Sequence, residues 1–191
     1  MANCGALRRA DEGDLDSTHP VSILMREHEI ILGNLRELRD IAAQVKSARG
    51  FEELGGQLER LKAIARLLLD TESHHKREEE AIFPRMEQHG MMGPPQVMRM
   101  EHEELRARKR TLAGLVEQPG STGFAEFAVP VSEVGDYIAS ALTDHIFKED
   151  NILYPMALEA LEPEEWDKVR EEFDQIGYCP FTPGKTSSPQ A

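Results

Sequence analysis

Two histidine–glutamate pairs stand at the spacing that lets a helix place both side chains on one metal ion. His74 precedes Glu78 by four positions, and His145 precedes Glu149 by four positions. Residues at positions i and i+4 of a helix lie on the same face, with Cβ atoms roughly 5–6 Å apart. Imidazole is the commonest metal ligand, and carboxylate oxygens bind many of the same ions, so each pair predicts half of a metal site.

A shorter motif also occurs twice. Glu-His-Glu stands at 27–29 and again at 101–103, and both histidines fall on an apolar helical stripe that should face the core. Ionised carboxylates are almost never buried unless they are paired or bound to metal, because desolvation costs several kcal/mol. Histidine or glutamate on the buried stripe of four successive segments therefore indicates a metal site.

The longer segments HHKREEEAIFP (74–84) and HIFKEDNILYP (145–155) align on their aromatic-proline pairs. The alignment superimposes the two histidine–glutamate pairs and argues against His75 and Glu79, which have the same spacing. We therefore expect His75 on the solvent side and Glu79 on a solvated helix face. The predicted metal ligands are His28, His74, Glu78, His102, His145 and Glu149.

The ligand types narrow the choice of metal. With histidine, carboxylate and no thiolate, the expected ions are iron, manganese or zinc. Two carboxylates that can bridge suit a pair of ions roughly 3.5–4 Å apart. The arrangement is a pseudo-twofold variant of the di-metal carboxylate bundle, with His-xxx-Glu in place of Glu-xx-His.

Helical periodicity dominates the chain, and strand-like alternation is hard to find. The expected helices run from Pro20 to Gly50, through 61–82 to a stop around Pro84, from the breaker 90–95 to Pro119-Gly120, and through 134–152 with Pro130 and Pro155 as candidate kinks. Four such helices bury their apolar stripes most simply as an up-and-down antiparallel four-helix bundle, so the predicted fold class is all-α. Lys109 lies on the third stripe, and we expect its apolar stem to cover the core edge while its ammonium reaches water.

The predicted bundle spans residues 17–161. We expect residues 1–16 to be a flexible N-terminal segment. Residues 162–191 are expected to hold a short helix, at 163–176, and a disordered tail rich in Pro, Ser, Thr and Gly.

Composition excludes several classes of function. The 191 residues carry 22 Lys and Arg against 35 Asp and Glu, a net charge of −13, which disfavours nucleic acid and anionic lipid as partners. The apolar runs are too short to span a membrane, and the first residues have no export signal. The cysteines, Cys4 and Cys179, form no CxxC pair, so we expect a soluble protein of the reducing cytoplasm.

The ordered set of motifs resembles the hemerythrin-like (HHE cation-binding) family. It consists of Glu-His in the first helix, HxxxEE followed by Phe-Pro in the second, EHEEL in the third, and HxxKED followed by Tyr-Pro in the fourth. The resemblance covers about residues 19–161 and implies a non-haem di-iron centre, with zinc or manganese as second choices. The implied ligand sets are His28 and His74 for one iron, His102 and His145 for the other, and Glu78 and Glu149 as bridges.

One position departs from the family. Oxygen-carrying hemerythrins have a second histidine one turn before the third-helix histidine, where this sequence has Met98. One iron is therefore a ligand short unless water, His19, His89 or Tyr137 supplies it. An open position suits redox reactivity, sensing or iron delivery better than reversible oxygen carriage.

Three functions follow from this interpretation. The first is a di-iron protein that binds or reacts with dioxygen, peroxide or nitric oxide, in oxidant handling or sensing. The second is iron storage or donation, for example to iron-sulfur centre repair. The third is a zinc-bound or metal-free interaction scaffold. The sequence leaves open whether the protein is an enzyme, and no residue is assigned a catalytic role. The protein partner is also left open, as is the choice between monomer and homodimer.

Overall fold

The computed structural model describes residues 15–119 and 123–185, and every regular element within these ranges is a helix. The predicted all-α class is confirmed. The elements are α1 (Pro20–Ser47), the short turn η1 (Phe51–Glu53), α2 (Gln57–Leu69), α3 (Glu72–Arg77), the π-helical turn η2 (Glu78–Ile82), α4 (Phe83–Gln88), α5 (Gly93–Glu117), α6 (Phe124–Lys148), the π-helical turn η4 (Glu149–Leu153), α7 (Tyr154–Ala160) and α8 (Pro163–Ile176).

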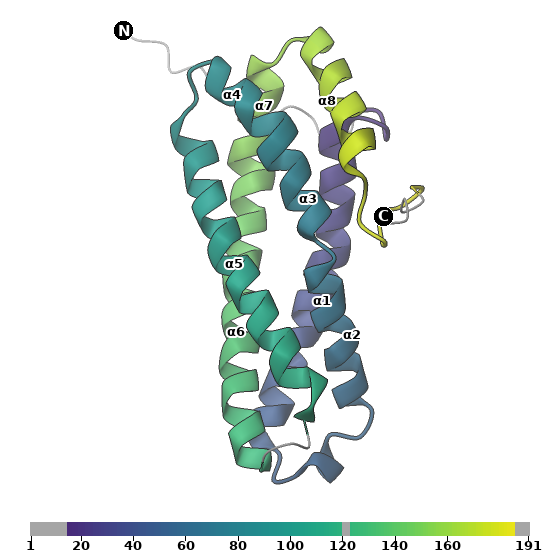
Figure 1. Cartoon of the computed structure of the whole chain (residues 1–191), viewed down its shortest axis with the longest axis vertical. Helices are drawn as coiled ribbons and strands as arrows, with labels where there is room; N and C mark the ends of the chain where they lie inside the picture. Colours follow the sequence, from purple (N-terminus) through teal and green to yellow (C-terminus); the bar gives the residue numbers. More distant parts are fainter. Residues whose placement is uncertain (1–14, 120–122, 186–191) are drawn as a thin grey trace, which may run out of the picture.

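The longer helices lie along the long axis of the molecule (Figure 1). α1 runs in one direction, α2 to α4 in the other, α5 reverses again, and α6 with α7 returns. Contacts join α1 to α6, α6 to α5, α5 to α2, and α2 to α1, which closes a ring around a shared interior. α8 lies outside this ring, against α1, α3 and η2.

The start of α1 is defined by its first two residues. Pro20 occupies the first turn, where a backbone N–H would have no partner in the helix. His19 is the N-cap, and its Nδ1 accepts a hydrogen bond from the Val21 N–H at 3.2 Å. The His19 ring also packs on Trp166, with ring centroids 4.7 Å apart. His19, a candidate metal ligand in the sequence, is therefore a capping residue.

Two π-helical turns interrupt the helices at matching places. The Phe83 N–H donates to the Glu78 carbonyl, and the Tyr154 N–H donates to the Glu149 carbonyl, in each case five residues back. The next residue is a proline, which has no N–H to donate and begins a new α-helical segment. The expected stop around Pro84 is therefore wrong, because the wide turn lets the helix continue to Gln88.

Buried apolar side chains form two clusters with a polar layer between them. One cluster contains Ile31 and Leu105, and the other contains Leu24 and Met98. His28 stands between Leu24 and Ile31 on α1, and a histidine of α5 stands between the other two. The polar layer is therefore closed on both sides by apolar packing, which keeps water away from it.

Residues 177–185 lie against the helices, although the sequence predicts a disordered tail from residue 177. Cys179 and Thr182 are both buried. Their burial comes from contacts with residues far away in sequence, which composition does not reveal. Residues 1–14, including Cys4, and residues 186–191 lie outside the described residues, so the expectations for them stay predictions. The domain boundaries also stay a prediction.

No helix in the described part of the chain has the length and apolar character needed to cross a bilayer.

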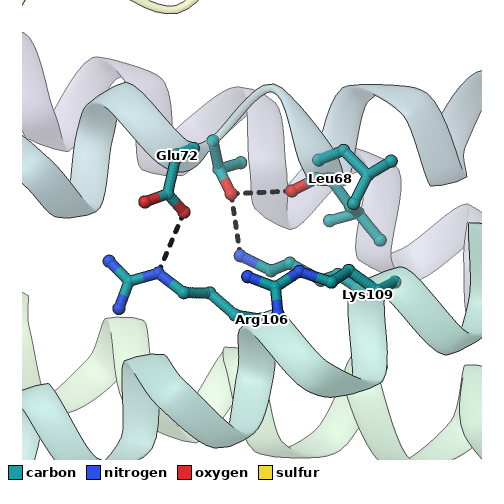
Figure 2. A pocket seen from close by; sticks show the side chains of 7 residues that line it. Leu68, Glu72, Arg106 and Lys109 are labelled. Carbon is teal, nitrogen blue, oxygen red and sulfur yellow. Dashed lines mark hydrogen bonds and ion pairs between the residues drawn. The ribbon is translucent and has the colours of Figure 1, made fainter.

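Lys109 is buried, so the expectation that its ammonium reaches water is wrong. Its Nζ donates a hydrogen bond to Thr71 Oγ1 at 2.7 Å, and Thr71 Oγ1 donates in turn to the Leu68 carbonyl (Figure 2). The amine lines a pocket of about 290 Å³ that also includes Arg106 and Arg110. Burial lowers the pKa of Lys109 to about 7, despite the nearby charge of Glu149. A charge in this position is a cost to folding.

Replacement of the buried amine should stabilise the protein. We expect Lys109→Met to raise the free energy of unfolding by about 1–4 kcal/mol below pH 7, because an apolar chain replaces a buried charge. The pKa of Lys109 is lower in the folded state than its ordinary 10.5, so the unfolded chain binds more protons between these values. Wild-type stability therefore rises across this range, and the advantage of the variant shrinks.

Denaturant unfolding below pH 7 and near pH 10 measures both effects. Lys62→Met is the matched control, because Lys62 forms a surface ion pair with Glu59 and should contribute about 1 kcal/mol or less. A destabilised Lys109→Met, or the same advantage at both pH values, would contradict the interpretation.

Candidate metal centre

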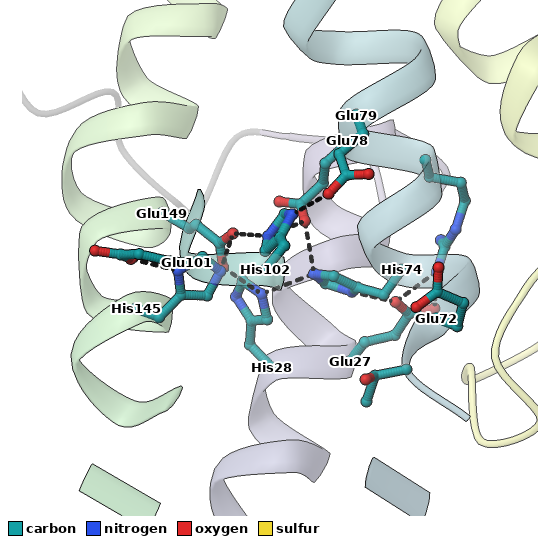
Figure 3. A network of polar contacts seen from close by, with 12 residues as sticks. Glu27, His28, Glu72, His74, Glu78, Glu79, Glu101, His102, His145 and Glu149 are labelled. Carbon is teal, nitrogen blue, oxygen red and sulfur yellow. Dashed lines mark hydrogen bonds and ion pairs between the residues drawn. The ribbon is translucent and has the colours of Figure 1, made fainter. Parts of the chain in front are cut away.

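All six side chains predicted as metal ligands meet in the polar layer. They come from the helical segments that surround the interior, and Figure 3 shows them converging from opposite sides. Each is buried. Their elements are α1 for His28, α3 for His74, η2 for Glu78, α5 for His102, α6 for His145 and η4 for Glu149.

Glu149 lies at the centre of the group. Its Oε2 is 3.3 Å from His28 Nε2. Its Oε1 is 3.4 Å from His102 Nε2 and 2.8 Å from His145 Nε2. One carboxylate therefore faces three imidazoles from three helices, and its two oxygens face different rings, as a bridging carboxylate would.

Glu78, the first residue of η2, faces imidazoles of the same cluster from another side and is arranged similarly. Its Oε2 is 3.5 Å from both His74 Nε2 and His102 Nε2. Its Oε1 accepts a hydrogen bond from the Tyr154 hydroxyl at 2.7 Å. Tyr154 therefore fixes one oxygen of Glu78 and leaves the other directed at the imidazoles.

His75 is also part of the cluster, so its predicted place on the solvent side is wrong. The side chain is buried, and its ring stacks on His102 with centroids 4.0 Å apart. A signal for this was present in the repeat, because His75 aligns with Ile146 and Ile146 is a buried core residue. The position faces inward in both copies, and only the residue type differs.

Three groups of side chains could each hold a metal ion, with ligand atoms within 4.8 Å of one another. The groups are His28, His74 and Glu149; Glu78, His102 and Glu149; and His75, His102 and His145. Glu149 and His102 each belong to two groups. The geometry therefore accommodates more than one ion in adjacent positions.

A second ring of carboxylates fixes the orientation of four imidazoles. In each case a carboxylate oxygen lies within 2.8 Å of an imidazole Nδ1, so this nitrogen carries the proton and donates it. The pairs are His28 with Asp150, His74 with Glu27, His102 with Glu79, and His145 with Glu101. With Nδ1 protonated, a neutral ring presents the lone pair of Nε2 to the centre, as a metal ligand must.

Glu79 lies only partly on a solvated face, because its side chain is 20% exposed. Its carboxylate binds His102 on one oxygen, at 2.6 Å, and Arg106 on the other, at 3.0 Å. Burial tends to raise the pKa of Glu79, but the hydrogen bonds from His102 and Arg106 lower it below its ordinary value.

The orienting acids follow the internal repeat. Glu27, which precedes His28, binds His74 of α3. Its counterpart Glu101, which precedes His102, binds His145 of α6. The acid after each central glutamate also crosses to another helix: Glu79 binds the α5 histidine, and Asp150 binds the α1 histidine. Each pair of adjacent residues therefore supplies one proposed metal ligand and one acid that orients a histidine of another helix.

Several buried atoms at the centre have no hydrogen-bond partner. They include Glu78 Oε2 and His75 Nδ1. In addition, His28 Nε2 and His74 Nε2 are 3.1 Å apart, although both rings already donate through Nδ1. Lone pairs that face one another in an apolar interior are unfavourable unless a proton or a cation lies between them. The donor set therefore fits metal ions, and His–carboxylate donors of this kind suit iron, manganese or zinc.

The two central carboxylates differ in their electrostatics. Burial and the charge of Glu149 raise the pKa of Glu78 well above its ordinary value. Burial also favours the neutral form of Glu149, but the surrounding imidazoles outweigh it and hold the pKa of Glu149 well below its ordinary value. Without added positive charge, ionisation of both carboxylates at once is therefore unfavourable.

The position one turn before His102 is apolar in the structure as well. Met98 is buried in the apolar cluster. The candidate substitutes lie elsewhere: His89 forms an ion pair with Glu165, and Tyr137 is exposed beside Arg108. Among the described residues, the additional imidazole near His102 is that of His75.

Fold and site together define an all-helical protein with buried histidine–glutamate clusters that could bind metal cations. The family model for the hemerythrin HHE cation binding domain matches residues 19–157. The chain belongs to this family, as the motifs in its sequence indicated. No curated protein matches the chain.

Glu27 and Glu101 make a matched pair for a stability test. Glu27 is buried and bonded to Arg77, whereas the side chain of Glu101 is 31% exposed. We expect Glu27→Gln to lower the free energy of unfolding of the metal-free protein by about 3–5 kcal/mol, because it leaves the Arg77 charge buried and unpaired. Glu101→Gln should cost about 1 kcal/mol or less, because its partner Lys148 can turn to water.

Urea unfolding in the presence of a chelator measures both variants without a contribution from metal. Equal costs for the two variants would show that the burial of Glu27 has no energetic consequence.

Proposed function

We propose that this protein holds two iron ions in the histidine–glutamate cluster and binds or reacts with small oxidants such as dioxygen, peroxide or nitric oxide. The observation that carries the proposal is the pair of buried carboxylates facing imidazoles whose Nδ1 atoms are all occupied by acids. The proposal includes the up-and-down antiparallel four-helix bundle, which the ring of helix contacts supports.

The proposed ligands divide between two positions. The first position has His28 and His74, and the second has His102 and His145 with His75 added. Glu78 and Glu149 would lie between the two ions. With His75, the second position has three imidazoles, which offsets the apolar residue at Met98. A pair of irons would supply one-electron redox chemistry and open coordination positions for a small ligand.

The surrounding residues exclude water and hold protons at known atoms. Tyr154 keeps its hydroxyl proton directed at Glu78 Oε1, and burial raises the pKa of Tyr154 well above its ordinary value. The Tyr154 proton is therefore retained at neutral pH. Buried apolar clusters lie on both sides of the layer, which favours a diatomic or peroxide ligand over a larger substrate.

We also propose that the protein works in the reducing cytoplasm. Cys179, the cysteine among the described residues, is a free thiol, as that compartment favours.

Metal analysis of protein from iron-replete cells tests the proposal. We expect about two irons per chain and a visible absorption band that changes when air is admitted to the reduced protein. His74→Ala and Glu149→Ala should each lower the metal content and the melting temperature, because metal binding stabilises the folded state. His75→Ala should lower the affinity at the second position by about tenfold or more.

His89→Ala is the control, because His89 lies at the surface in an ion pair with Glu165. Unchanged metal content in His74→Ala and Glu149→Ala would contradict the ligand assignment. Iron that passes readily to a chelator with no change in air would favour iron donation. Zinc, or a folded protein without metal, would favour the interaction scaffold.

Metal binding should depend on pH through His28. Burial tends to lower the pKa of His28, but Asp150 and Glu149 outweigh it and raise the pKa to about 9. The metal-free protein therefore keeps this proton at pH 7, whereas the unfolded chain has lost most of it above 6.5. The resulting stabilisation of the metal-free fold is complete below pH 6.5 and disappears as pH rises through 9.

A metal ion must displace the His28 proton, so its affinity should rise between pH 7 and pH 9 by about tenfold per pH unit for each proton displaced. Calorimetric titration with zinc in buffers of different ionisation enthalpy counts the protons released. His28→Ala should release at least one proton fewer. Binding that releases no proton at pH 7 would contradict this account.

A further inference from the structure

The chain continues beyond the family match, and its last described part covers one side of the metal centre. We call residues 163–185, which comprise α8 and the segment after it, the C-terminal strap. The match to the family model covers residues 19–157, so the strap lies outside the matched part of the chain. It lies against α1, α3 and η2, the elements that carry His28, His74 and Glu78 (Figure 1).

The strap encloses the side chain of Arg77. The guanidinium carbon is 5.2 Å from the ring centroid of Phe173 and 5.0 Å from that of Tyr178. Arg77 Nη2 donates to both oxygens of Glu27 at 2.7 Å. Both side chains of this ion pair are 0% exposed. Two aromatic residues of the strap therefore keep water away from an ion pair of the inner protein.

The strap also contacts Glu27 directly. The Thr182 hydroxyl donates a hydrogen bond to Glu27 Oε1. The other oxygen of Glu27 accepts the Nδ1 proton of His74 at 2.6 Å. A continuous chain of contacts therefore connects the strap to the imidazole of a proposed metal ligand.

Cys179 fills the space between these contacts. Its Sγ accepts from Ser73 Oγ at 3.3 Å and lies 3.7 Å from Arg77 Nη2. Burial and the charge of Glu27 raise the pKa of Cys179 to about 11. The thiol is therefore protonated and serves as a packing residue.

The internal repeat provides a comparison without a strap. The counterpart of Arg77 and Glu27 is the ion pair of Lys148 and Glu101, which orients His145. In that pair the lysine is 34% exposed and the glutamate 31% exposed. The remaining orienting acids are also partly exposed, at 20% for Glu79 and 21% for Asp150. Glu27 is the one orienting acid of the four that has no contact with water.

We propose that the C-terminal strap makes the two metal positions exchange at different rates, by locking the position of His28 and His74 and leaving that of His102 and His145 open to exchange. The inference rests on the proposed function, since it requires two bound ions. A histidine leaves its ion when the ring turns, and the ring turns when its Nδ1 bond breaks. Water can replace that bond at Glu79, Glu101 and Asp150, whereas Arg77 and the strap prevent this at Glu27. The first position therefore keeps His74 when His28 turns away, whereas both His102 and His145 of the second position can turn.

Release of zinc from the full-length protein tests the proposal. Protein loaded with two zinc ions per chain is mixed with excess chromophoric chelator, and release is followed by absorbance. We expect two phases of release in the wild type. Thr182→Val keeps the shape of the side chain and removes its hydroxyl, so it should accelerate the slow phase by about 10–100-fold and leave the fast phase unchanged. Thr111→Val, at an exposed hydroxyl bonded within its own helix, should change neither phase.

Swapping the basic residues of the two repeats, Arg77 and Lys148, gives a second pair of variants. Arg77→Lys gives Glu27 a lysine partner, as Glu101 has in Lys148. We expect the two release phases to merge in this variant. Lys148→Arg should leave the fast phase unchanged, because water already reaches this ion pair, in which Lys148 is 34% exposed.

Imidazole proton signals assign the phases to the two positions, because zinc is diamagnetic. The His74 Nδ1 proton should exchange with solvent more slowly than the His145 Nδ1 proton, and Thr182→Val should remove most of the difference. Two bound zinc ions with one release phase, or a slow phase that Thr182→Val does not change, would overturn the role of the strap and leave the metal site standing. A wild type that binds neither zinc nor iron would overturn both proposals.

Discussion

The structure depends on the repulsion between two buried carboxylates, Glu78 and Glu149. Burial and the charge of its neighbour raise the pKa of Glu78 well above its ordinary value. Two such groups can share an apolar interior only when positive charge lies beside them. The imidazoles around them provide a place for that charge, and the outer acids hold the imidazoles in orientation. The apolar clusters on both sides exclude water, which would otherwise weaken every attraction in the layer.

Sequence patterns predicted the six side chains at the centre of the site, but not the roles of the residues that directly follow three of them. A histidine and a glutamate on a buried helical stripe have few explanations, so spacing and repeat were sufficient for the six residues that meet at the centre. Glu79 and Asp150 directly follow the central glutamates. A run of charged residues on a helix is usually a solvated face, which is what we expected for Glu79. Both acids instead reach histidines of neighbouring helices. His75 was missed because the alignment served only to choose between the two histidine–glutamate pairs, although the counterpart of His75, Ile146, is a buried apolar residue.

Other features depend on contacts that no local pattern contains. The bond between Thr182 and Glu27 joins residues 155 positions apart, and a tail rich in small and polar residues gives no sign of it. The burial of Lys109 similarly depends on the gap between α2 and α3, where the Thr71 hydroxyl accepts its proton. Periodicity identified the correct helix face for Lys109 but could not show whether its amine reaches water. The wide turns at Glu78 and Glu149 belong to the same class, because an aromatic-proline pair can either end a helix or follow a π-helical turn.

Protons and metal ions compete for the same layer of side chains. The outer ring contributes four acids, and Arg77, Arg106 and Lys148 are bonded to three of them. With neutral imidazoles the layer therefore keeps an excess of negative charge. In the metal-free protein that excess is reduced by protons, which is why the pKa values of His28 and His145 are raised although burial opposes it. Two divalent ions would supply more positive charge than these protons and would release the imidazole lone pairs to bind them. The acids that orient the ligands thus stabilise positive charge in the layer, whether protons or metal ions carry it. The exclusion of water determines how readily metal ions replace the protons.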